Sequence, residues 1–327
     1  MGNDVADYDN DGNPDVITVD MLPPDEKTSK TYGSDDNLDI YRLKIENNGY
    51  QQQYSRNCLQ HNNGNGVNFS EVGIINNVYA TDWSWAPLFA DFDNDGVKDL
   101  FVSSGIVKRP VDLDYVRFIS SLYVKHAADN TDIYDQEAID KMPDGASHPF
   151  FFKGNIKEGF KEVSADWGTG KMKGYYTGAS YADLDNDGDL DMVMNCINSK
   201  AVILKNNSPK QNHISVSFKG NDQNSFGIGC KVYLFQKGTL QYQQLMLTRG
   251  FQSSVSPTLS FGMGNVSYID SVLVIWPDQQ YEIMHNVSHN NHLLMKQSSA
   301  SGHFDFKTFL PPKASVLSNI SSQLKIP

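Results

Sequence analysis

The chain has 327 residues and a formal net charge of −12, from 39 acidic and 27 basic side chains. This acidic balance, without a basic stripe, argues against nucleic acid as a partner. No apolar run approaches the roughly 20 residues of a membrane-spanning helix, and the first residues lack the charged and apolar regions of a signal peptide. We expect no membrane span in this chain and, if the protein is exported, a signal peptide outside it.

Three near-identical acidic loops occur along the chain, at residues 7–15 (loop 1), 91–99 (loop 2) and 183–191 (loop 3). Aspartate occupies positions 1, 3, 5 and 9 of each loop, and glycine occupies position 6. Four clustered carboxylates require a cation to neutralise them, and an all-oxygen ligand set favours Ca²⁺. The glycine permits the sharp turn that directs the position-7 carbonyl at the ion.

The sequence therefore predicts about three bound Ca²⁺ ions, which would halve the net charge. We expect a structural role, in which each ion fixes a turn between two strands. The alternative is an open coordination position that binds a partner's carboxylate or a sugar hydroxyl. The predicted ligands, with the position-7 residue contributing its carbonyl, are Asp7, Asp9, Asp11, Asn13, Asp15, Asp91, Asp93, Asp95, Val97, Asp99, Asp183, Asp185, Asp187, Asp189 and Asp191.

The first half of each loop also matches an EF-hand, which needs a bidentate glutamate at position 12 on a helix. Position 12 is Thr18, Val102 or Met194, and none of these can replace a carboxylate. Short β-branched and apolar runs follow all three loops, which indicates strands and not helices. We therefore interpret each loop as a metal-clamped turn between two strands.

The pattern D-x-D-x-D-G-x-x-D between two strands resembles the calcium loops of FG-GAP repeats, also called VCBS repeats, which form the blades of integrin-α-like β-propellers. A second repeat supports this resemblance, because Phe69 precedes Asp91 by 22 residues and Phe160 precedes Asp183 by 23. The resemblance implies an all-β fold, with a partial β-propeller over residues 1–209.

The loops begin 84 and 92 residues apart, more than the roughly 40 to 50 residues of a four-stranded blade. Two insertions explain the surplus. Residues 21–57 are polar and contain Pro23-Pro24, so we predict mostly loop. Residues 111–142 carry apolar side chains at helical spacing, which predicts one or two short helices over the rim of the propeller.

The N-terminal end predicts an incomplete ring. Residue 7 already lies inside a loop, so we expect no room for a preceding strand and its blade. Propellers close with about four to eight blades, whereas only about three calcium-bearing units are visible. We therefore expect this chain to be a fragment of a longer protein.

From residue 210 onward the acidic loops stop and apolar and polar residues alternate, which predicts a second all-β, sandwich-like domain over 210–297 and a tail or linker over 298–327. This part resembles the ASPIC/UnbV domain, with Cys230 where a small residue, usually alanine, is expected. Together with Ala80–Gly96, it resembles the large exported FG-GAP and ASPIC/UnbV proteins of Bacteroidetes. The stretches that carry the ASPIC/UnbV resemblance are Gly-Ile-Gly-Cys-Lys-Val at 227–232, Arg-Gly-Phe-Gln-Ser-Ser at 249–254, Leu-Ser-Phe-Gly-Met-Gly at 259–264 and Val-Leu-Val-Ile-Trp-Pro-Asp at 272–278.

Aromatic residues precede loops 2 and 3 at matching places. Trp83 and Trp85 alternate around one serine, and Tyr175 and Tyr176 occupy the equivalent stretch. Exposed aromatic pairs stack on sugars or seat partner proteins, but propeller cores also use large aromatics, and we favour the core. We expect packing roles for Trp167 and Trp276 and buried thiols at Cys58, Cys196 and Cys230.

Three histidines, His285, His289 and His292, have a spacing that suits a metal site on a helix. The local pattern predicts strands and turns, on which these side chains do not converge. Glu71 and Glu162 recur at equivalent positions, which indicates blade architecture and not a catalytic acid.

The sequence favours a non-catalytic, calcium-binding, extracellular or cell-surface binding and adhesion module that recognises a protein or glycan. The alternative is the scaffold part of an exported polysaccharide- or polymer-degrading enzyme, which would need a carboxylate pair outside the loops, about 5 to 10 Å apart in a cleft. We expect an extracellular, outer-membrane-surface or periplasmic location. The sequence does not indicate an oligomeric state.

Overall fold

The computed structural model describes residues 1–309 except 33–37, 52–53, 65, 130–134 and 222. It is all-β with short helices, and its small sheets have a β-propeller-like arrangement. The predicted fold class is thus confirmed. Among the helices of these residues, none combines the length and apolarity needed to cross a membrane.

Three antiparallel sheets carry the acidic loops, and we call them blades 1 to 3. Blade 1 has the strand order β1 (Asn3–Ala6), β2 (Asp15–Thr18), β4 (Cys58–Asn62) and β5 (Phe69–Glu71). Blade 2 has the order β11 (Gly159–Glu162), β10 (Phe150–Asn155), β7 (Asp99–Ser104), β6 (Asp82–Ala90) and β3 (Met21–Leu22). Blade 3 has the order β12 (Tyr176–Ala182), β13 (Asp191–Cys196) and β14 (Val202–Leu204).

The strands β1, β6 and β12 lie side by side, with β6 in contact with both β1 and β12, and we call them the inner strands. Each acidic loop joins the inner strand of its blade to the next strand of that blade along the chain, so the three loops occupy equivalent places. The expectation that no strand precedes loop 1 is wrong. Four residues suffice for β1, which pairs with β2 from Asn3 opposite Thr18 to Ala6 opposite Asp15.

The core lies between the blades. One apolar cluster joins blades 1 and 2 around Ile17, Leu59 and Leu100, which are fully buried. A second cluster joins blades 2 and 3 around Phe101 and Met194. Every residue of β7 is buried because both faces of this strand are covered, and each such apolar side chain contributes about 1.5 to 3 kcal/mol to folding.

Helices interrupt both predicted insertions. The segment 21–57 contains α1 (Glu26–Thr31), α2 (Leu38–Arg42) and the π-helical turn η1 (Leu43–Asn47), so the prediction of mostly loop is wrong in the described part. Local signals account for α1, because the carboxylate of Asp25 accepts a hydrogen bond from the N–H of Thr28 and caps the helix.

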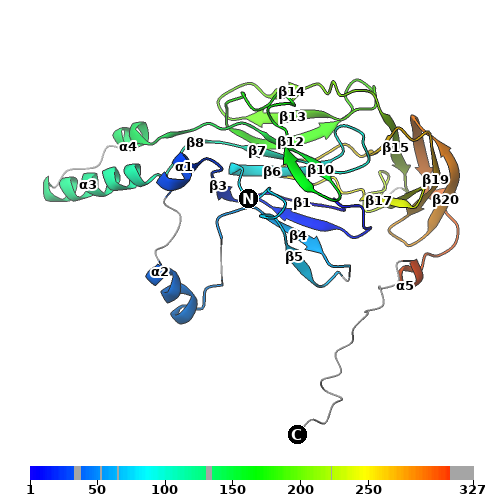
Figure 1. Cartoon of the computed structure of the whole chain (residues 1–327), viewed down its shortest axis with the longest axis horizontal. Coiled ribbons are helices and arrows are strands. Elements are labelled where there is room, and N and C mark those ends of the chain that lie inside the picture. The colour runs from blue at the N-terminus through cyan, green and yellow to red at the C-terminus, as the bar shows by residue number, and fades with distance from the viewer. Residues whose placement is uncertain (33–37, 52–53, 65, 130–134, 222, 310–327) are drawn as a thin grey trace, which may run out of the picture.

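The second insertion contains α3 (Leu113–Asp129) and α4 (Asp135–Lys141), which confirms the predicted helices. Their expected place over the propeller rim is wrong. The strands β8 (Ile106–Lys108) and β9 (Asp144–Gly145) form a ribbon beyond which both helices extend away from the sheets (Figure 1). Val116, Tyr123 and Val124 of α3 are accordingly exposed.

The C-terminal part is a sandwich of two sheets around one core that contains Ile214, Phe261 and Trp276. One sheet has the order β18 (Leu259–Gly264), β15 (Asn212–Lys219) and β21 (Asn291–Lys296). The other has the order β17 (Thr239–Gln244), β16 (Lys231–Gln236), β19 (Tyr268–Ile275) and β20 (Tyr281–Ser288). The short helices η2 (Gln297–Ser299) and α5 (Phe306–Phe309) follow, and Phe309 packs on this sandwich. Residues 310–327 of the expected tail lie outside the described residues.

Two of the four aromatic side chains before the loops belong to the core, as predicted, and the other two are half-buried. Trp83 and Tyr176 are buried. Trp85 is half-buried, its indole N–H donates to the carbonyl of Gly105 at 2.8 Å, and its ring packs on Phe251. Tyr175 is half-buried and donates its hydroxyl to a carboxylate.

The two other tryptophans pack as predicted. Trp276 is buried, and Trp167 is half-buried against Phe151. Among the three cysteines, Cys196 and Cys230 are buried free thiols, as predicted, whereas Cys58 on β4 is only half-buried.

Candidate metal centres

The three acidic loops share one backbone conformation. The asparagine at position 4 has a φ of 57 to 60° in every loop, and the glycine at position 6 has a φ of 87 to 95°. Asparagine tolerates the left-handed region and glycine enters it without a steric penalty, so these two residue types fold nine residues into a tight turn.

Backbone N–H groups hold the first and last carboxylates of each loop. In loop 1, Asp7 accepts hydrogen bonds from the N–H groups of Asp11 and Gly12, each at 3.0 Å. Asp15 accepts from Tyr8 at 3.3 Å and from Asn62, on β4, at 2.8 Å. The equivalent bonds recur in loops 2 and 3. The loop conformation thus fixes these carboxylates before any ion binds.

The carboxylates at positions 1, 3 and 9 converge in every loop. One oxygen from each lies within 4.8 Å of the others in the groups Asp7, Asp9 and Asp15; Asp91, Asp93 and Asp99; and Asp183, Asp185 and Asp191. The position-5 carboxylates of Asp11, Asp95 and Asp187 instead accept hydrogen bonds from the N–H of the residue two positions later. The position-7 carbonyls of Asn13, Val97 and Asp189 remain predicted ligands.

Burial makes the convergent carboxylates resist ionisation when no cation is present. Desolvation, with smaller contributions from neighbouring aspartates, raises the pKa of Asp7 to about 8 and of Asp15 to about 7. It also raises the pKa of Asp91 to about 7 and that of Asp99 well above its usual value. Loop 3 is more open, since Asp183 and Asp185 are exposed. A bound divalent cation would remove the electrostatic cost of ionising these groups.

A basic or histidine residue faces each loop from the third strand of the blade, counted from the inner strand, or from the residue directly after it. Lys153 on β10 donates to Asp93 and, at 2.7 Å, to Asp95. Lys205, directly after β14, donates to Asp185, and His61 on β4 lies beside Asp9. Each directly precedes the residue whose N–H holds the position-9 carboxylate. These residues could not be found from the sequence, because His61, Lys153 and Lys205 follow their loops by 46, 54 and 14 residues, a spacing without a pattern.

The position-4 asparagines connect one loop to the next. The side-chain amide of Asn10 donates to the carbonyl of Gly96 at 2.8 Å. The amide of Asn94 donates to the carbonyl of Gly188 at 3.2 Å and to the carboxylate of Asp189 at 2.7 Å. The three loops therefore form a hydrogen-bonded row.

The other sequence candidates are not part of this row, although His292 lines a small cavity together with Asp183 and Gly188 of loop 3. His285 lies on β20, His289 follows this strand, and His292 lies on β21 with its ring bonded to the hydroxyls of Ser215 and Ser217. The carboxylate of Glu71 accepts from the guanidinium of Arg56 at 2.7 Å and from nearby backbone N–H groups, whereas Glu162 lies 3.8 Å from His148.

Arg249 from the sandwich meets the inner strand of every blade. Its guanidinium forms a bidentate pair with Asp4 on β1, with distances of 2.7 and 2.5 Å, and donates to the carbonyl of Phe89 on β6 at 3.0 Å. It also donates to the hydroxyl of Tyr181 on β12. The next residue, Gly250, pairs with Asn3 as an isolated β-bridge. Arg249 thus fastens the sandwich to the centre of the propeller-like part.

Comparison with protein families found two matching models. The family model for the FG-GAP-like repeat matches residues 34–102, which include α2, β4, β5, β6 and loop 2 and end within β7. The model for ASPIC and UnbV matches residues 220–302, which cover most of the sandwich. The chain carries an FG-GAP-like repeat and an ASPIC/UnbV domain. Loops 1 and 3 lie outside the FG-GAP match but repeat the geometry of loop 2, and Arg249 lies within the ASPIC/UnbV domain. No curated protein matches the chain.

Proposed function

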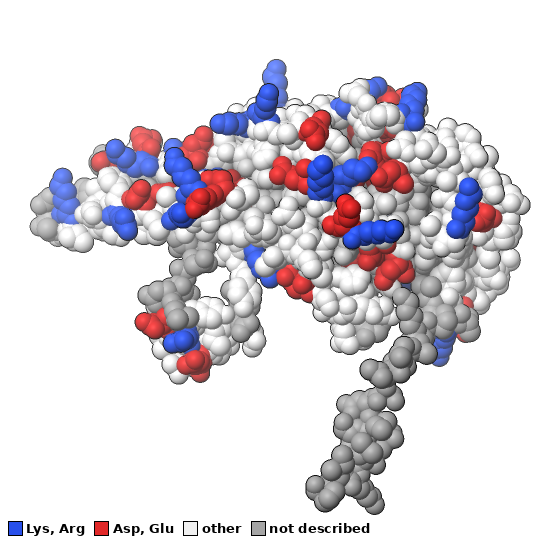
Figure 2. All heavy atoms as spheres, viewed as in Figure 1, with Lys and Arg blue, Asp and Glu red and all other residues white. Residues whose placement is uncertain are grey.

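We propose that this chain is a calcium-stabilised binding module that recognises a protein or glycan and catalyses no reaction itself. The observation that carries the proposal is the convergence of three aspartates at the same place in each of three blades. The FG-GAP-like repeat and the ASPIC/UnbV domain fit an extracellular module. Acidic and basic side chains are interspersed on the face shown in Figure 2, and such a surface favours selective binding of one ligand over general binding of polyanions.

Calcium suits these loops better than magnesium. Ca²⁺ accepts six to eight oxygen ligands in a flexible geometry at about 2.3–2.6 Å, whereas Mg²⁺ demands a near-ideal octahedron at about 2.0–2.1 Å. Extracellular modules bind Ca²⁺ with a Kd on the order of 10⁻⁴ to 10⁻³ M, which keeps them loaded outside cells. Such an ion would fix the register between the first and second strands of each blade.

A cavity between blades 2 and 3 is the best candidate for the ligand site. It has a volume of about 490 Å³ and combines the half-buried ring of Trp167 with the polar groups of Asp166 and Asn207. Asp93 of loop 2 and Lys205, which is bonded to loop 3, also line it. An aromatic ring beside carboxylate and amide groups suits a sugar ring or a peptide side chain. Because two loops form part of the wall, calcium would order this cavity.

The test is a screen of immobilised glycans and of proteins, run with Ca²⁺ and with a chelator. We expect a ligand that binds only with Ca²⁺, and about tenfold weaker binding by a Trp167→Ala variant. A Tyr268→Ala variant, which removes an exposed aromatic ring from the sandwich, serves as the matched control and should bind as the unmodified protein does. Hydrolysis of a screened polymer would contradict the non-catalytic role and favour the enzyme alternative.

A further inference from the structure

Loop 1 differs from the other two loops in the residue that faces it. Lys153 and Lys205 each place an ammonium group against the position-3 carboxylate of loops 2 and 3. In blade 1, His61 occupies the equivalent place. An ammonium group can only donate hydrogen bonds, whereas a neutral imidazole nitrogen can bind a metal ion.

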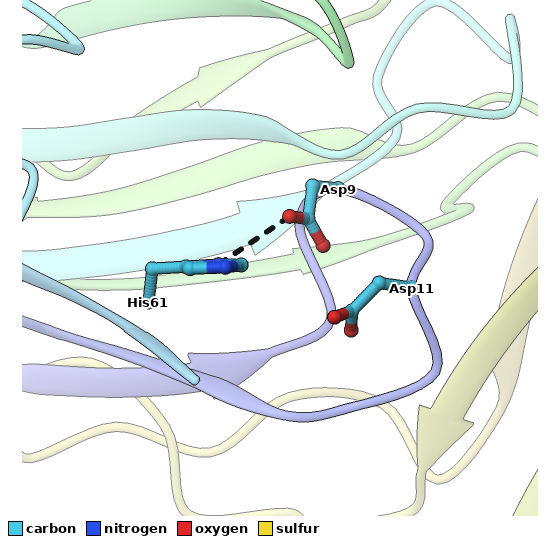
Figure 3. Close-up of side chains that lie close together, drawn as sticks. All are labelled: Asp9, Asp11 and His61. Atoms are coloured by element: carbon cyan, nitrogen blue, oxygen red, sulfur yellow. Dashed lines mark ion pairs between the residues drawn. The ribbon is translucent and has the colours of Figure 1, made fainter. Parts of the chain in front are cut away.

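The imidazole of His61 is directed at loop 1 (Figure 3). Its Nδ1 atom lies 3.4 Å from Oδ2 of Asp9 and 3.4 Å from Oδ1 of Asp15. Ligand atoms of His61, Asp9 and Asp11 also lie within 4.8 Å of one another. One nitrogen and several carboxylate oxygens thus face the same small volume.

These contacts are too long for hydrogen bonds. An N–H···O bond measures about 2.7–3.2 Å between heavy atoms. Nδ1 of His61 and Oδ1 of Asp9 are both shielded from solvent, and neither has a hydrogen-bond partner. A buried polar atom without a hydrogen-bond partner costs about 1–3 kcal/mol, and one ion bound by both residues would remove both costs.

A metal ion accounts for this spacing. Ligands about 2.0–2.1 Å from a tetrahedral ion lie about 3.4 Å from one another. The nitrogen then selects the class of ion, because Ca²⁺ takes oxygen ligands whereas imidazole together with carboxylates suits Zn²⁺ and related divalent ions. The lysines exclude such a nitrogen ligand from loops 2 and 3.

We propose that loop 1 is a mixed nitrogen and oxygen site for a zinc-like transition-metal ion, with His61 as a ligand beside Asp9 and Asp15. This inference rests on the proposed role of the loops as cation sites and assigns to one of them a different ion. Loop 1 still takes Ca²⁺ when Ca²⁺ is the only divalent ion present. When both are available, the transition-metal ion displaces it.

The test uses Co²⁺ as a spectroscopic probe for Zn²⁺, added to the full chain in saturating Ca²⁺. We expect one equivalent to bind with the visible absorption of a nitrogen-containing, low-coordinate site, and Zn²⁺ to displace it. His61→Lys, which copies blades 2 and 3, should weaken this binding by at least about tenfold. His292→Asn, which alters a histidine bonded to two serines in the sandwich, should leave it unchanged. The reverse change Lys153→His should create a second Co²⁺ site in blade 2.

Circular dichroism and the melting temperature in Ca²⁺ confirm that each variant is folded. Equal Co²⁺ affinity and spectrum in the unmodified and His61→Lys proteins would overturn the inference. That result leaves the calcium proposal intact if Ca²⁺ still raises the melting temperature. Conversely, Co²⁺ binding could depend on His61 in a protein whose melting temperature does not change with Ca²⁺. That result would uphold this site and refute calcium stabilisation.

Discussion

Replacing Arg249 by alanine is expected to lower the free energy of unfolding by about 3–5 kcal/mol, because the change leaves a buried carboxylate without its partner. Asp4 is only 2% exposed, and its two oxygens both bond to the guanidinium. The substitution also removes the hydrogen bonds to β6 and β12, so the sandwich loses the contacts of this side chain with all three inner strands.

Urea unfolding of the variants measures this effect. The control is Arg117→Ala, which removes an exposed charge pair on α3 and should change the free energy of unfolding by no more than about 1 kcal/mol. The double variant Asp4→Leu with Arg249→Met should be more stable than Arg249→Ala, because neither charge then remains buried alone. If Arg249→Ala lowers the free energy of unfolding no more than Arg117→Ala does, the central role of Arg249 is refuted.

Without calcium, the protein is expected to become less stable as the pH rises from 5 to 8. Burial raises the pKa of Asp7 from 3.8 to about 8, and that of Asp15 and of Asp91 to about 7. The folded state therefore holds protons that the unfolded chain has released, so its free energy of unfolding falls as the pH rises through these values. Each pKa unit corresponds to about 1.4 kcal/mol.

Melting curves at pH 5 and pH 8, in chelator and in excess Ca²⁺, measure this dependence. In chelator we expect the melting temperature to fall by about 5 °C or more between the two pH values. In Ca²⁺ the fall should shrink or reverse, since the ion replaces the protons. Carboxyls with a lowered pKa, such as Glu71 paired with Arg56, lose their contribution only below pH 5 and do not interfere. A chelated protein more stable at pH 8 than at pH 5 would contradict the uncompensated burial of these carboxyls.

The sequence predicts the loops well because each loop builds its turn from nine consecutive residues. Asn94 and Gly96 set the backbone of loop 2 locally, and Asp91 and Asp99 take their first hydrogen bonds from within the same loop. The repeated motif then places the blades, because a turn of known type needs a strand on either side.

Contacts between distant segments could not be predicted in this way. His61 and Lys153 reach their loops only after blade-specific insertions, and Arg249 meets Asp4 across 245 residues. The direction of α3 depends on the ribbon of β8 and β9, for which the local pattern gives no signal. Strand β1 was missed because four residues are too few to show a period of two.

A calorimetric titration of the chelated protein, with Ca²⁺ as the only divalent ion, measures calcium binding by the three loops. We expect about three ions per chain, and two after Asp185→Ala in the exposed loop 3, where loss of one ligand should leave the fold intact. The melting temperature should rise with Ca²⁺ and much less with Mg²⁺. At a Ca²⁺ concentration a hundredfold above its Kd, each site should add about 2.7 kcal/mol to the free energy of unfolding. No heat of binding and an unchanged melting temperature would contradict the assignment of the three loops as calcium sites.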